Sequence, residues 1–357
     1  MAEEHTPNGY NARCPIPVSG SSDRITLAHG EGGKLMRQLI ADRIVPALTG
    51  AELLRHMDDA ARLPDIGGRP AVSTDSFVVS PLFFPGGDIG SLAVHGTVND
   101  LAVSGARPMY LTLSLILEEG LHLSVLDAVL HSVADASAEA QVQVVAGDTK
   151  VVPRGAADGL FINTTGVGRW IEPVPRGPTT LVPGDVVIVS GPIGRHGIAV
   201  LCAREELDLH PPPISDCAPL HAPAAALVER LGGRLRCMRD ATRGGVAAVL
   251  HEWAQACGGR ITIEESLVPI SPPVRGACEL LGLDPLHVAN EGTMVIAVAP
   301  QAVEEALETL QSFAQTAEAA RIGEVQPNGL APVTIRRLLG GERPLDEPLG
   351  AALPRIC

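Results

Sequence analysis

The stretch PAVSTDSFVVS (Pro70–Ser80), continued by DIGSLAVHGTVNDLAVSG (Asp88–Gly105) and MYLTLSLIL (Met109–Leu117), decides the fold of this chain. The first segment is rich in β-branched residues and the last has a period of two, so both predict strands. The middle segment predicts a helix that Asp88 caps and Gly105 ends. A strand, a helix and a strand in this order indicate an α/β architecture.

The segments that follow extend this architecture. Ser124 and Asp127 resemble a capping box at the start of a second helix, whose apolar face continues to Ala140. VQVVAGD (Val142–Asp148) and LFINTTGVG (Leu160–Gly168) predict two more strands. The order β-α-β-α-β-β therefore predicts an α/β domain that ends near residue 168.

A proline-rich stretch, GRWIEPVPRGPTTLVPGD, separates this domain from a second unit. Strand patterns in DVVIVS, ITIEE and MVIAVA and helical patterns in RGGVAAVLHEWAQAC and QAVEEALETLQSFAQ predict a second mixed α/β domain. The final DEPLGAALPRIC contains two prolines and no sustained period, so we expect an extended tail. We divide the chain into a loose extension, a first domain, a linker, a second domain and a mobile tail: residues 1–23, 24–168, 169–184, 185–340 and 341–357.

The composition limits the classes of function. Of the 357 residues, 45% are hydrophobic, 19% charged and 3% aromatic, which is typical of a globular protein. The net charge of −14 argues against nucleic acid or an anionic membrane as the main partner. It leaves room for a nucleotide, because helix N-termini and a few cations can hold phosphates. No apolar run reaches the roughly 20 residues of a membrane span.

The seven cysteines include no C-x-x-C pair, and one of them, Cys357, is the last residue. A disulfide framework or a tetrahedral zinc site is therefore poorly supported, and a reducing cytoplasm is the expected compartment. Cys257 and Cys278 stand among apolar residues and are expected to pack as small hydrophobic side chains.

Three aspartates stand at predicted strand ends or on the intervening helix: Asp75 in STDSF, Asp100 in TVNDLA and Asp148 in AGDTK. Strand ends are where open α/β sheets collect ligand groups. Carboxylate oxygens suit magnesium, which usually holds the phosphates of a nucleotide. Each aspartate alone is more simply explained as solvated. Three of them beside small residues such as Ser76 and Thr149 predict a magnesium–nucleotide site.

Two glycine-rich turns precede helical patterns. In HGEGGK, Gly32, Gly33 and Lys34 can present backbone N–H groups to phosphate, although the spacing is not that of a Walker A loop. In RDATRGG, Asp240 and Arg243 can contact metal or phosphate. The alternative in both cases is an ordinary turn with helix capping.

Three further residues could take part in catalysis. Lys150 is either an exposed lysine at a strand end or a group that stabilises developing negative charge or transfers a proton. Glu291, in VANEGTMVIAV, is either a loop carboxylate or a general base with a raised pKa. His95, a lone histidine on the predicted helix, is more simply explained as structural.

Several of these segments together resemble one family. TDSFVVSPLFFPGGDIGSLAVHGTVNDLAVSGARP, GDTKVV, DGLFINTTGVG, TRGG, GACELLGLDPLHVANEG and the terminal PRIC are similar to the HypE family of hydrogenase maturation factors, over about His29 to Cys357. The first block and the PRIC ending are highly specific, whereas the glycine loop is not. RDATRGG departs slightly, with Ala241 where the family often carries proline.

The resemblance places the chain in the superfamily of aminoimidazole ribonucleotide synthetase and selenophosphate synthetase. It implies a two-domain PurM-like architecture, α/β in the first domain and α+β with a mixed sheet in the second. The first sheet would pair with a second subunit in a homodimer, and the tail would be mobile. ATP and magnesium would lie at the junction of domains and subunits.

The resemblance also implies a reaction. HypF would place a carbamoyl group on Cys357, and the protein would dehydrate the thiocarboxamide to a thiocyanate with ATP. The cyano group would pass to iron on the HypC–HypD complex, for the [NiFe]-hydrogenase centre. Glu291 and Lys150 are the two candidate bases, and the choice between them stays open. The nucleotide would be bound by Gly32, Gly33, Lys34, Asp75, Asn99, Asp100, Asp148, Thr149 and Arg243, with Asp75, Asp100 and Asp148 as the magnesium ligands.

Two other hypotheses stay open. An ATP-dependent synthetase acting on a free small substrate, such as a purine intermediate or selenide, would make the tail incidental. The missing reactive Cys or selenocysteine near a glycine-rich N-terminus argues against the selenium branch. A non-enzymatic, nucleotide-sensing carrier would use its terminal cysteine only to dock a partner.

Overall fold

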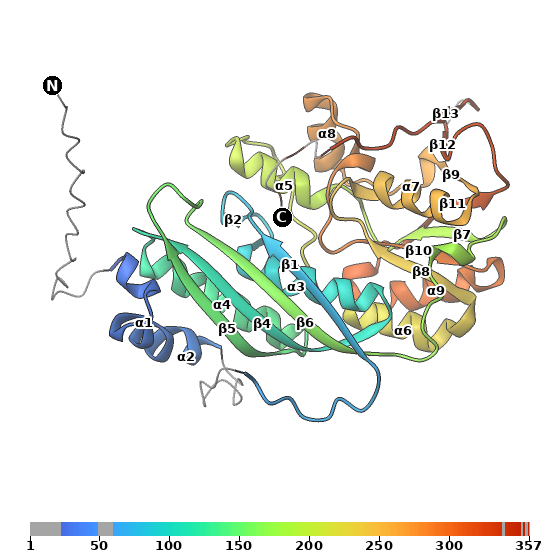
Figure 1. Ribbon diagram of the computed structural model, residues 1–357. Coiled ribbons are helices and arrows are strands. Elements are labelled where there is room, and N and C mark those ends of the chain that lie inside the picture. Colours follow the sequence, from blue (N-terminus) through green and yellow to red (C-terminus); the bar gives the residue numbers. More distant parts are fainter. Residues whose placement is uncertain (1–22, 49–59, 338–339, 351–352, 354–355, 357) are drawn as a thin grey trace, which may run out of the picture.

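The computed structural model describes residues 23–48, 60–337, 340–350, 353 and 356. Two domains lie side by side, one built on a four-stranded sheet and the other on a seven-stranded sheet (Figure 1). Within these residues, no helix is both long and apolar enough to cross a membrane. The predicted fold class, a two-domain architecture of mixed α/β type, is confirmed.

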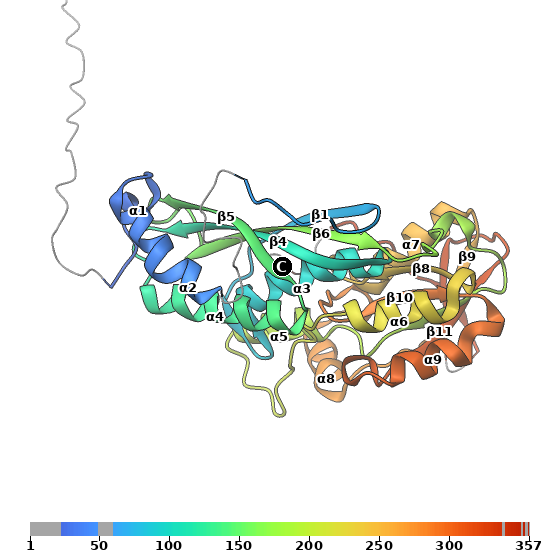
Figure 2. The same cartoon turned by 90° about the horizontal axis from the view of Figure 1, so that it is seen from below.

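The first domain packs two helices against one face of its sheet. Its main elements are β1 (Pro70–Phe77), α3 (Ile89–Val103), β4 (Ala106–Glu118), α4 (Leu123–Glu139), β5 (Gln143–Val152) and β6 (Leu160–Trp170). The strand order is β1-β6-β4-β5, with β4 and β5 parallel and the other pairs antiparallel. Figure 2 shows α3 and α4 on the same side of this sheet. The opposite face carries no helix of the described residues.

Short elements complete this domain. They are η1 (Leu27–Gly30), α1 (Lys34–Leu39), the π-helical η2 (Ile40–Ile44), α2 (Val45–Ala47), β2 (Phe83–Phe84) and β3 (Gly87–Asp88). The 3-10 helix η1 lies against the end of β5, where a Cβ added to Gly30 would stand 2.6 Å from the backbone nitrogen of Val151. The glycine-rich turn therefore starts beside strand β5.

Helix capping agrees with the sequence at α3 and differs at α4. The Asp88 carboxylate accepts hydrogen bonds from the backbone N–H groups of Gly90 and Ser91, as predicted. The predicted capping box at Ser124 is wrong, because α4 begins one residue earlier and His122 precedes it without a side-chain cap. The carboxylate of Asp127 pairs instead with the guanidinium of Arg43.

The second domain has helices on both faces of its sheet. Its main elements are β7 (Val186–Val189), α5 (Arg195–Arg204), α6 (His221–Leu231), β8 (Leu235–Asp240), α7 (Gly245–Cys257), β9 (Arg260–Glu264), α8 (Pro272–Leu281), β10 (Met294–Val298), α9 (Val303–Gln311), β11 (Ala320–Gln326), β12 (Val333–Arg336) and β13 (Glu342–Pro344). The order is β13-β12-β9-β11-β7-β10-β8, antiparallel except for β12 with β9. Helix α7 packs with one face, and α6 and α9 with the other. Strands β7 and β10 are buried along their whole length, which explains their unbroken apolar sequences.

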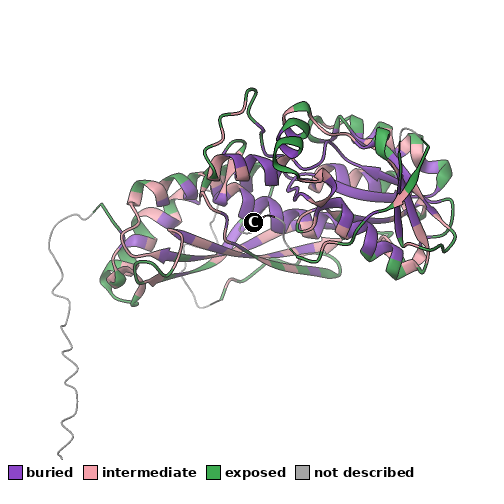
Figure 3. Ribbon diagram, turned by 90° about the horizontal axis from the view of Figure 1, so that it is seen from above, coloured by how far each residue is buried: buried purple, intermediate pink, exposed green. Residues whose placement is uncertain are grey.

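Helix α3 joins the two domains. It is buried on nearly all sides, because one side packs under the first sheet while Ala102 and Val103 pack against the second domain. Figure 3 shows buried residues concentrated in the middle of the molecule and exposed ones on the outer helices. Residues near the end of α3 are therefore positioned by both domains.

The boundary of the tail differs from the expectation. Glu342–Pro344, counted above with the tail, form strand β13 and pair with β12. The second sheet therefore extends into the predicted tail. At the other end of the tail, Ile356 is only 4% exposed and packs into the core cluster of the first domain, with Leu353 against it.

Candidate active site

Four carboxyl groups gather where β1 and α3 meet the second domain. We call Asp75, Asp100, Asp240 and Glu291 the acidic cluster. Asp100 on α3 accepts a 2.6 Å hydrogen bond from the Ser73 hydroxyl of β1.

The charges of this cluster affect one another. Burial raises the pKa of Asp100, and the charge of Asp75 adds to the rise. Asp240, at the end of β8, has its pKa raised to about 6 by burial and by the charge of Asp100. The nearest cation to Asp75 is the guanidinium of Arg243, 3.7 Å from its carboxylate. Negative charges that raise one another's pKa values are typical of a place where a cation binds.

Glu291 is the most buried member of the cluster, with an exposure of 3%. Its Oε1 atom has no hydrogen-bond partner among the described residues. Burial, followed by the charge of Asp240, raises the pKa of Glu291 well above its usual value. A buried, unpartnered carboxyl is costly unless a ligand uses it. The raised pKa agrees with the prediction of a general base at this position.

The loop around Glu291 is held by Asp216. The Asp216 carboxylate accepts hydrogen bonds from the backbone N–H groups of Glu291 and Gly292, both at 3.1 Å, and from the Thr293 hydroxyl at 2.8 Å. Contact here is so close that a Cβ on Gly292 would lie 1.7 Å from the Asp216 carbonyl oxygen. Only glycine fits at position 292 without moving the backbone.

Asn99 ties the same loop to the first domain. Its side-chain amide donates to the carbonyl oxygens of Glu291 at 2.9 Å and Ala218 at 3.0 Å, and its oxygen accepts from the N–H of Leu220 at 2.7 Å. Both amide protons are thus used within the protein. Asn99, predicted as a nucleotide contact, positions the Glu291 loop in this structure.

The remaining predicted residues lie elsewhere. Asp148, Thr149 and Lys150, which we call the β5 group, stand on the edge strand opposite β1. The register runs from Asp148 through Ser114 and Asn163 to Ser76, so three strand spacings, about 14 Å, separate the two edges.

Asp148 and Lys150 of the β5 group also lie on the opposite face of the sheet from Asp75. The side chains of Asp148 and Lys150 form a 3.2 Å ion pair and are 53% and 61% exposed, on the face opposite to that of the buried Thr149 between them. Thr149 is buried on the helical face. Asp75 lies on the helical face too, because it stands two residues before the buried Phe77 in strand β1. A single chain therefore does not bring Asp75, Asp100 and Asp148 together, and no cluster of three metal-binding side chains occurs within the described segments.

The predicted glycine turn stays near the β5 group. Gly33 precedes α1, and Gly32 has a positive φ of 75°. A Cβ added to Gly32 or Gly33 would meet no atom within 4 Å, so the turn is open to a ligand. Lys34 begins α1 and is exposed. Within one chain, the glycine turn therefore lies close to the β5 group and apart from the acidic cluster.

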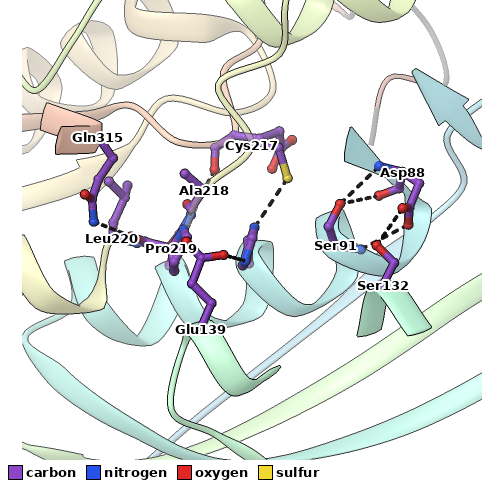
Figure 4. A network of polar contacts seen from close by, with 12 residues as sticks. Asp88, Ser91, Ser132, Glu139, Cys217, Ala218, Pro219, Leu220 and Gln315 are labelled. Atoms are coloured by element: carbon purple, nitrogen blue, oxygen red, sulfur yellow. Dashed lines mark hydrogen bonds and ion pairs between the residues drawn. The ribbon is translucent and has the colours of Figure 1, made fainter. Parts of the chain in front are cut away.

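A further polar network surrounds Cys217 (Figure 4). Its sulfur lies 3.6 Å from Nδ1 of His95, whose Nε2 is 3.6 Å from the Glu139 carboxylate. Burial lowers the pKa of His95 to about 4, and burial raises the pKa of the Cys217 thiol well above its usual value. Both groups are uncharged at neutral pH, so this is not an activated thiolate. His95 is structural, as the sequence favoured.

Cys357 lies outside the described residues. Its neighbour Ile356 is described, and the Ile356 carbonyl oxygen is 2.8 Å from Nε2 of the buried His196. The sequence did not single out His196 or Asp216. The only signal was the short polar run SDC (Ser215–Cys217) between proline-rich and apolar segments.

Two family models match this chain. The N-terminal domain of the AIR synthase related proteins matches residues 57–170, and their C-terminal domain matches residues 182–334. The protein is thus a two-domain member of the AIR synthase related class, whose domains meet at helix α3 and the acidic cluster.

More specific relatives narrow this class. The chain is 48% identical to the carbamoyl dehydratase HypE of Escherichia coli K12, over 94% of this chain and 100% of that protein. A crystal structure of the hydrogenase maturation protein HypE in complex with ATP matches with a TM-score of 0.88 and 43% identity, over 93% and 99% of the two chains. HypE in a HypE–HypF complex matches with a TM-score of 0.76 and 45% identity, over 88% and 100%. This chain belongs to the HypE family.

Proposed function

We propose that this protein dehydrates a carbamoyl group on the sulfur of its own Cys357 to a thiocyanate, with ATP. The observation that carries the proposal is a pairing of two buried features: the unpartnered carboxyl of Glu291 and the tail end at Ile356. The E. coli relative is named a carbamoyl dehydratase, and a similar HypE was crystallised with ATP. An enzyme that processes its own chain end needs that end inside the protein and a base close by.

The chemistry explains why ATP and a base are both required. The amide oxygen of a thiocarboxamide is a very poor leaving group. Transfer of the γ-phosphoryl group to this oxygen makes it leave as phosphate, and the nitrogen gives up two protons while the C≡N bond forms. Overall, R–S–CO–NH₂ and ATP yield R–S–C≡N, ADP and phosphate. We assign Glu291 as the base that takes an N–H proton, because its raised pKa favours proton uptake.

We propose that Asp75, Asp100 and Asp240 line a site for magnesium and the phosphates of ATP, in which one or two of them bind the ion. Their carboxylate oxygens suit this hard cation, and the mutual repulsion of Asp100 and Asp240 is relieved by a positive ion. Magnesium usually keeps several ligands from phosphate and water, so one or two protein carboxylates are sufficient. When bound, the ion neutralises charge on the transferring phosphoryl group. Arg243, close to Asp75, would stabilise the same phosphates.

We further propose a homodimer in which the β5 group serves the acidic cluster of a second copy. The face of the first sheet without helices exposes Val72 at 67% and Ile116 at 39%, an unusual placement for apolar strand residues. Two such faces can stack about a two-fold axis, so that edge strand β5 of one copy meets edge strand β1 of the other. Lys150, Asp148 and the turn with Gly32, Gly33 and Lys34 would then reach the nucleotide from the partner copy.

The proposed partners follow from the family. We propose that HypF supplies the carbamoyl group, since a relative was crystallised as a HypE–HypF complex. The product would transfer its cyano group to iron on the HypC–HypD complex, for [NiFe]-hydrogenase maturation. Cys202, Cys217, Cys237, Cys257 and Cys278 are free, which suits a reducing cytoplasm.

One experiment tests the reaction. The carbamoylated protein is incubated with Mg-ATP, and the mass of the C-terminal peptide is followed. Loss of one water from the peptide that contains Cys357 is expected, and Cys357→Ala should bind ATP normally yet form no thiocyanate. A thiocyanate formed by Cys357→Ala would contradict the assignment.

The same assay separates the two other hypotheses. Normal turnover of a free substrate by a protein truncated before residue 354 would favour the small-molecule synthetase. Binding of ATP without hydrolysis, even with a carbamoylated tail, would favour the non-enzymatic carrier.

A further inference from the structure

Three histidine side chains bind backbone carbonyl groups of the C-terminal segment. His251 and His287 contact the carbonyl oxygens of Leu345 and Asp346, at 3.0 and 2.9 Å, where the segment leaves strand β13. His196 contacts the carbonyl oxygen of Ile356 at 2.8 Å, at the other end. A carbonyl oxygen only accepts hydrogen bonds, so the Nε2 atom of each ring carries the proton.

The neighbours of His196 indicate which of its two ring nitrogens carries the proton. Its Nδ1 lies 2.8 Å from the Ser215 hydroxyl, whose oxygen also accepts the N–H of Cys217 at 3.0 Å. Burial lowers the pKa of His196 and so favours the neutral ring. With the proton on Nε2, Nδ1 accepts a hydrogen bond from the Ser215 hydroxyl. The ring of Phe84, from the first domain, meets it edge-on at 5.3 Å. The imidazole is thus a fixed donor aimed at the tail.

The same short segment controls the tail end and the base. Ser215 orients His196, while the next residue, Asp216, holds the backbone of Glu291. Ser215 is itself anchored by a 2.8 Å hydrogen bond from its N–H to the Pro85 carbonyl. Ile356 is buried among residues of the first domain, whereas Leu345 packs in the core of the second domain. The start of the tail is therefore held by the second domain, whereas its end lies between the domains, with the Ile356 side chain in the core cluster of the first and its carbonyl on His196 of α5 in the second.

We propose that His196 is the positioning residue that latches the docked end of the tail, through its hydrogen bond to the Ile356 carbonyl. This rests on the proposed function, which requires Cys357 to visit the active site and partner proteins in turn. His251 and His287 hold the start of the tail both when its end is docked and when its end is released. One neutral hydrogen bond is weak enough to break reversibly, and its loss should shift the docking equilibrium about fivefold.

The test uses the full chain without ATP or partners. N-ethylmaleimide is added, and the alkylation rate of each cysteine is followed by peptide mass spectrometry. His196→Ala should raise the alkylation rate of Cys357 about fivefold, and His196→Gln, which keeps an N–H donor, should restore most of the protection. His251→Ala is the matched control, since it removes a buried histidine–carbonyl bond at the start of the tail. It should have a smaller effect on Cys357.

The buried Cys202, Cys237 and Cys278 report on the fold in the same samples. Equal rates for Cys357 in the wild-type protein and His196→Ala would overturn the proposal. So would an increase shared by the three buried cysteines, which would show that the bond supports the fold instead of the tail. Equal increases in the Ala and Gln variants would overturn the assignment of the hydrogen bond.

A second measurement separates this inference from the proposed function. In single-turnover dehydration, the rate follows the docked fraction, which stays close to one while docking is favoured, so His196→Ala should dehydrate the tail at nearly the wild-type rate and with unchanged ATP affinity. If the alkylation results hold but no variant dehydrates the tail, the latch stands and the proposed function fails. If dehydration proceeds but the alkylation rate of Cys357 is the same in wild type and His196→Ala, the function stands and the latch fails.

Discussion

The acidic cluster and the β5 group carry both predicted bases and all three predicted magnesium ligands, yet their environments are opposite. The acidic cluster is enclosed by both domains, and Asp100, Asp240 and Glu291 all have raised pKa values. In the β5 group, Asp148 and Lys150 are more than half exposed on an uncovered sheet face. Within one chain, the acidic cluster is thus enclosed, whereas the β5 group is exposed to solvent.

This difference is the basis of the proposed homodimer. The Glu291 loop is held in place by Asp216 and Asn99, so it needs no ligand to be ordered. Among the residues that the structure describes, the Lys150 side chain pairs with Asp148, two residues away, and an exposed ion pair of this kind contributes little. An exposed lysine of this kind would bind a ligand selectively only if another surface covered it. The four predictions below test this contrast, beginning with the largest effect.

Removing the base should have the largest effect. Glu291→Gln keeps the size of the side chain but cannot take a proton, so the dehydration rate should fall about 10²- to 10⁴-fold. ATP binding should persist. The measurement is single-turnover conversion of the carbamoylated C-terminal peptide, with the exposed Glu265→Gln as control. Near-normal conversion by Glu291→Gln would move the base function away from the acidic cluster.

The next prediction asks whether the two halves belong to different chains. Lys150→Ala should lower the rate about 10²-fold, because it removes a positive charge near the phosphates. An equal mixture of Lys150→Ala and Glu291→Gln, dissociated and reassembled, should regain about a quarter of wild-type activity. Half of the dimers are then mixed, and each mixed dimer has one intact site. A mixture no more active than its components would show that both residues act within one chain.

The third prediction concerns the rigidity of the acidic cluster. Gly292→Ala drives a Cβ to within 1.7 Å of the Asp216 carbonyl, so the free energy of unfolding should fall by about 3 kcal/mol. Urea denaturation measures the loss. Gly276→Ala, inside α8 with no atom within 4 Å of the added Cβ, is the control and should be neutral or stabilising. Equal stability of the two variants would mean that the loop is not clamped.

The smallest expected effect is a pH-dependent change at Asp240. Its pKa rises from 3.8 to about 6 on folding, so the folded protein binds the proton more tightly. This contribution to stability is fully present below pH 4 and is lost as the pH rises to about 6. Asp240→Asn should therefore raise the free energy of unfolding by about 2 kcal/mol more at pH 7.5 than at pH 4.5.

Urea denaturation at the two pH values, without magnesium or ATP, provides this measurement. The exposed Asp42→Asn serves as control, with no pH-dependent difference expected. A stabilisation by Asp240→Asn that is the same at both pH values would contradict the burial of charge in the acidic cluster.

Local patterns predicted much of the fold. The period of two in MYLTLSLIL and the Asp88 cap place β4 and α3 within a few residues of their observed bounds. The capping box predicted at Ser124 was wrong, because α4 already begins at Leu123. The Asp127 carboxylate pairs instead with Arg43, which is far away in the sequence. The candidate site was predicted in parts. Glu291 has the expected raised pKa, whereas Asn99 turned out to hold a loop and Asp148 faces away from Asp75.

By itself, the sequence determined the two domains, their strands and helices, the family motifs and the residue types available for chemistry. These depend on periodicity, caps and turns, which act over a few neighbouring residues. Only the tertiary structure decided which carboxyl groups share one desolvated space and which sheet face each residue takes. Asp216 and the Glu291 loop are 75 residues apart, and His196 and Ile356 are 160 apart. Such contacts form through packing between domains, and no local period encodes them.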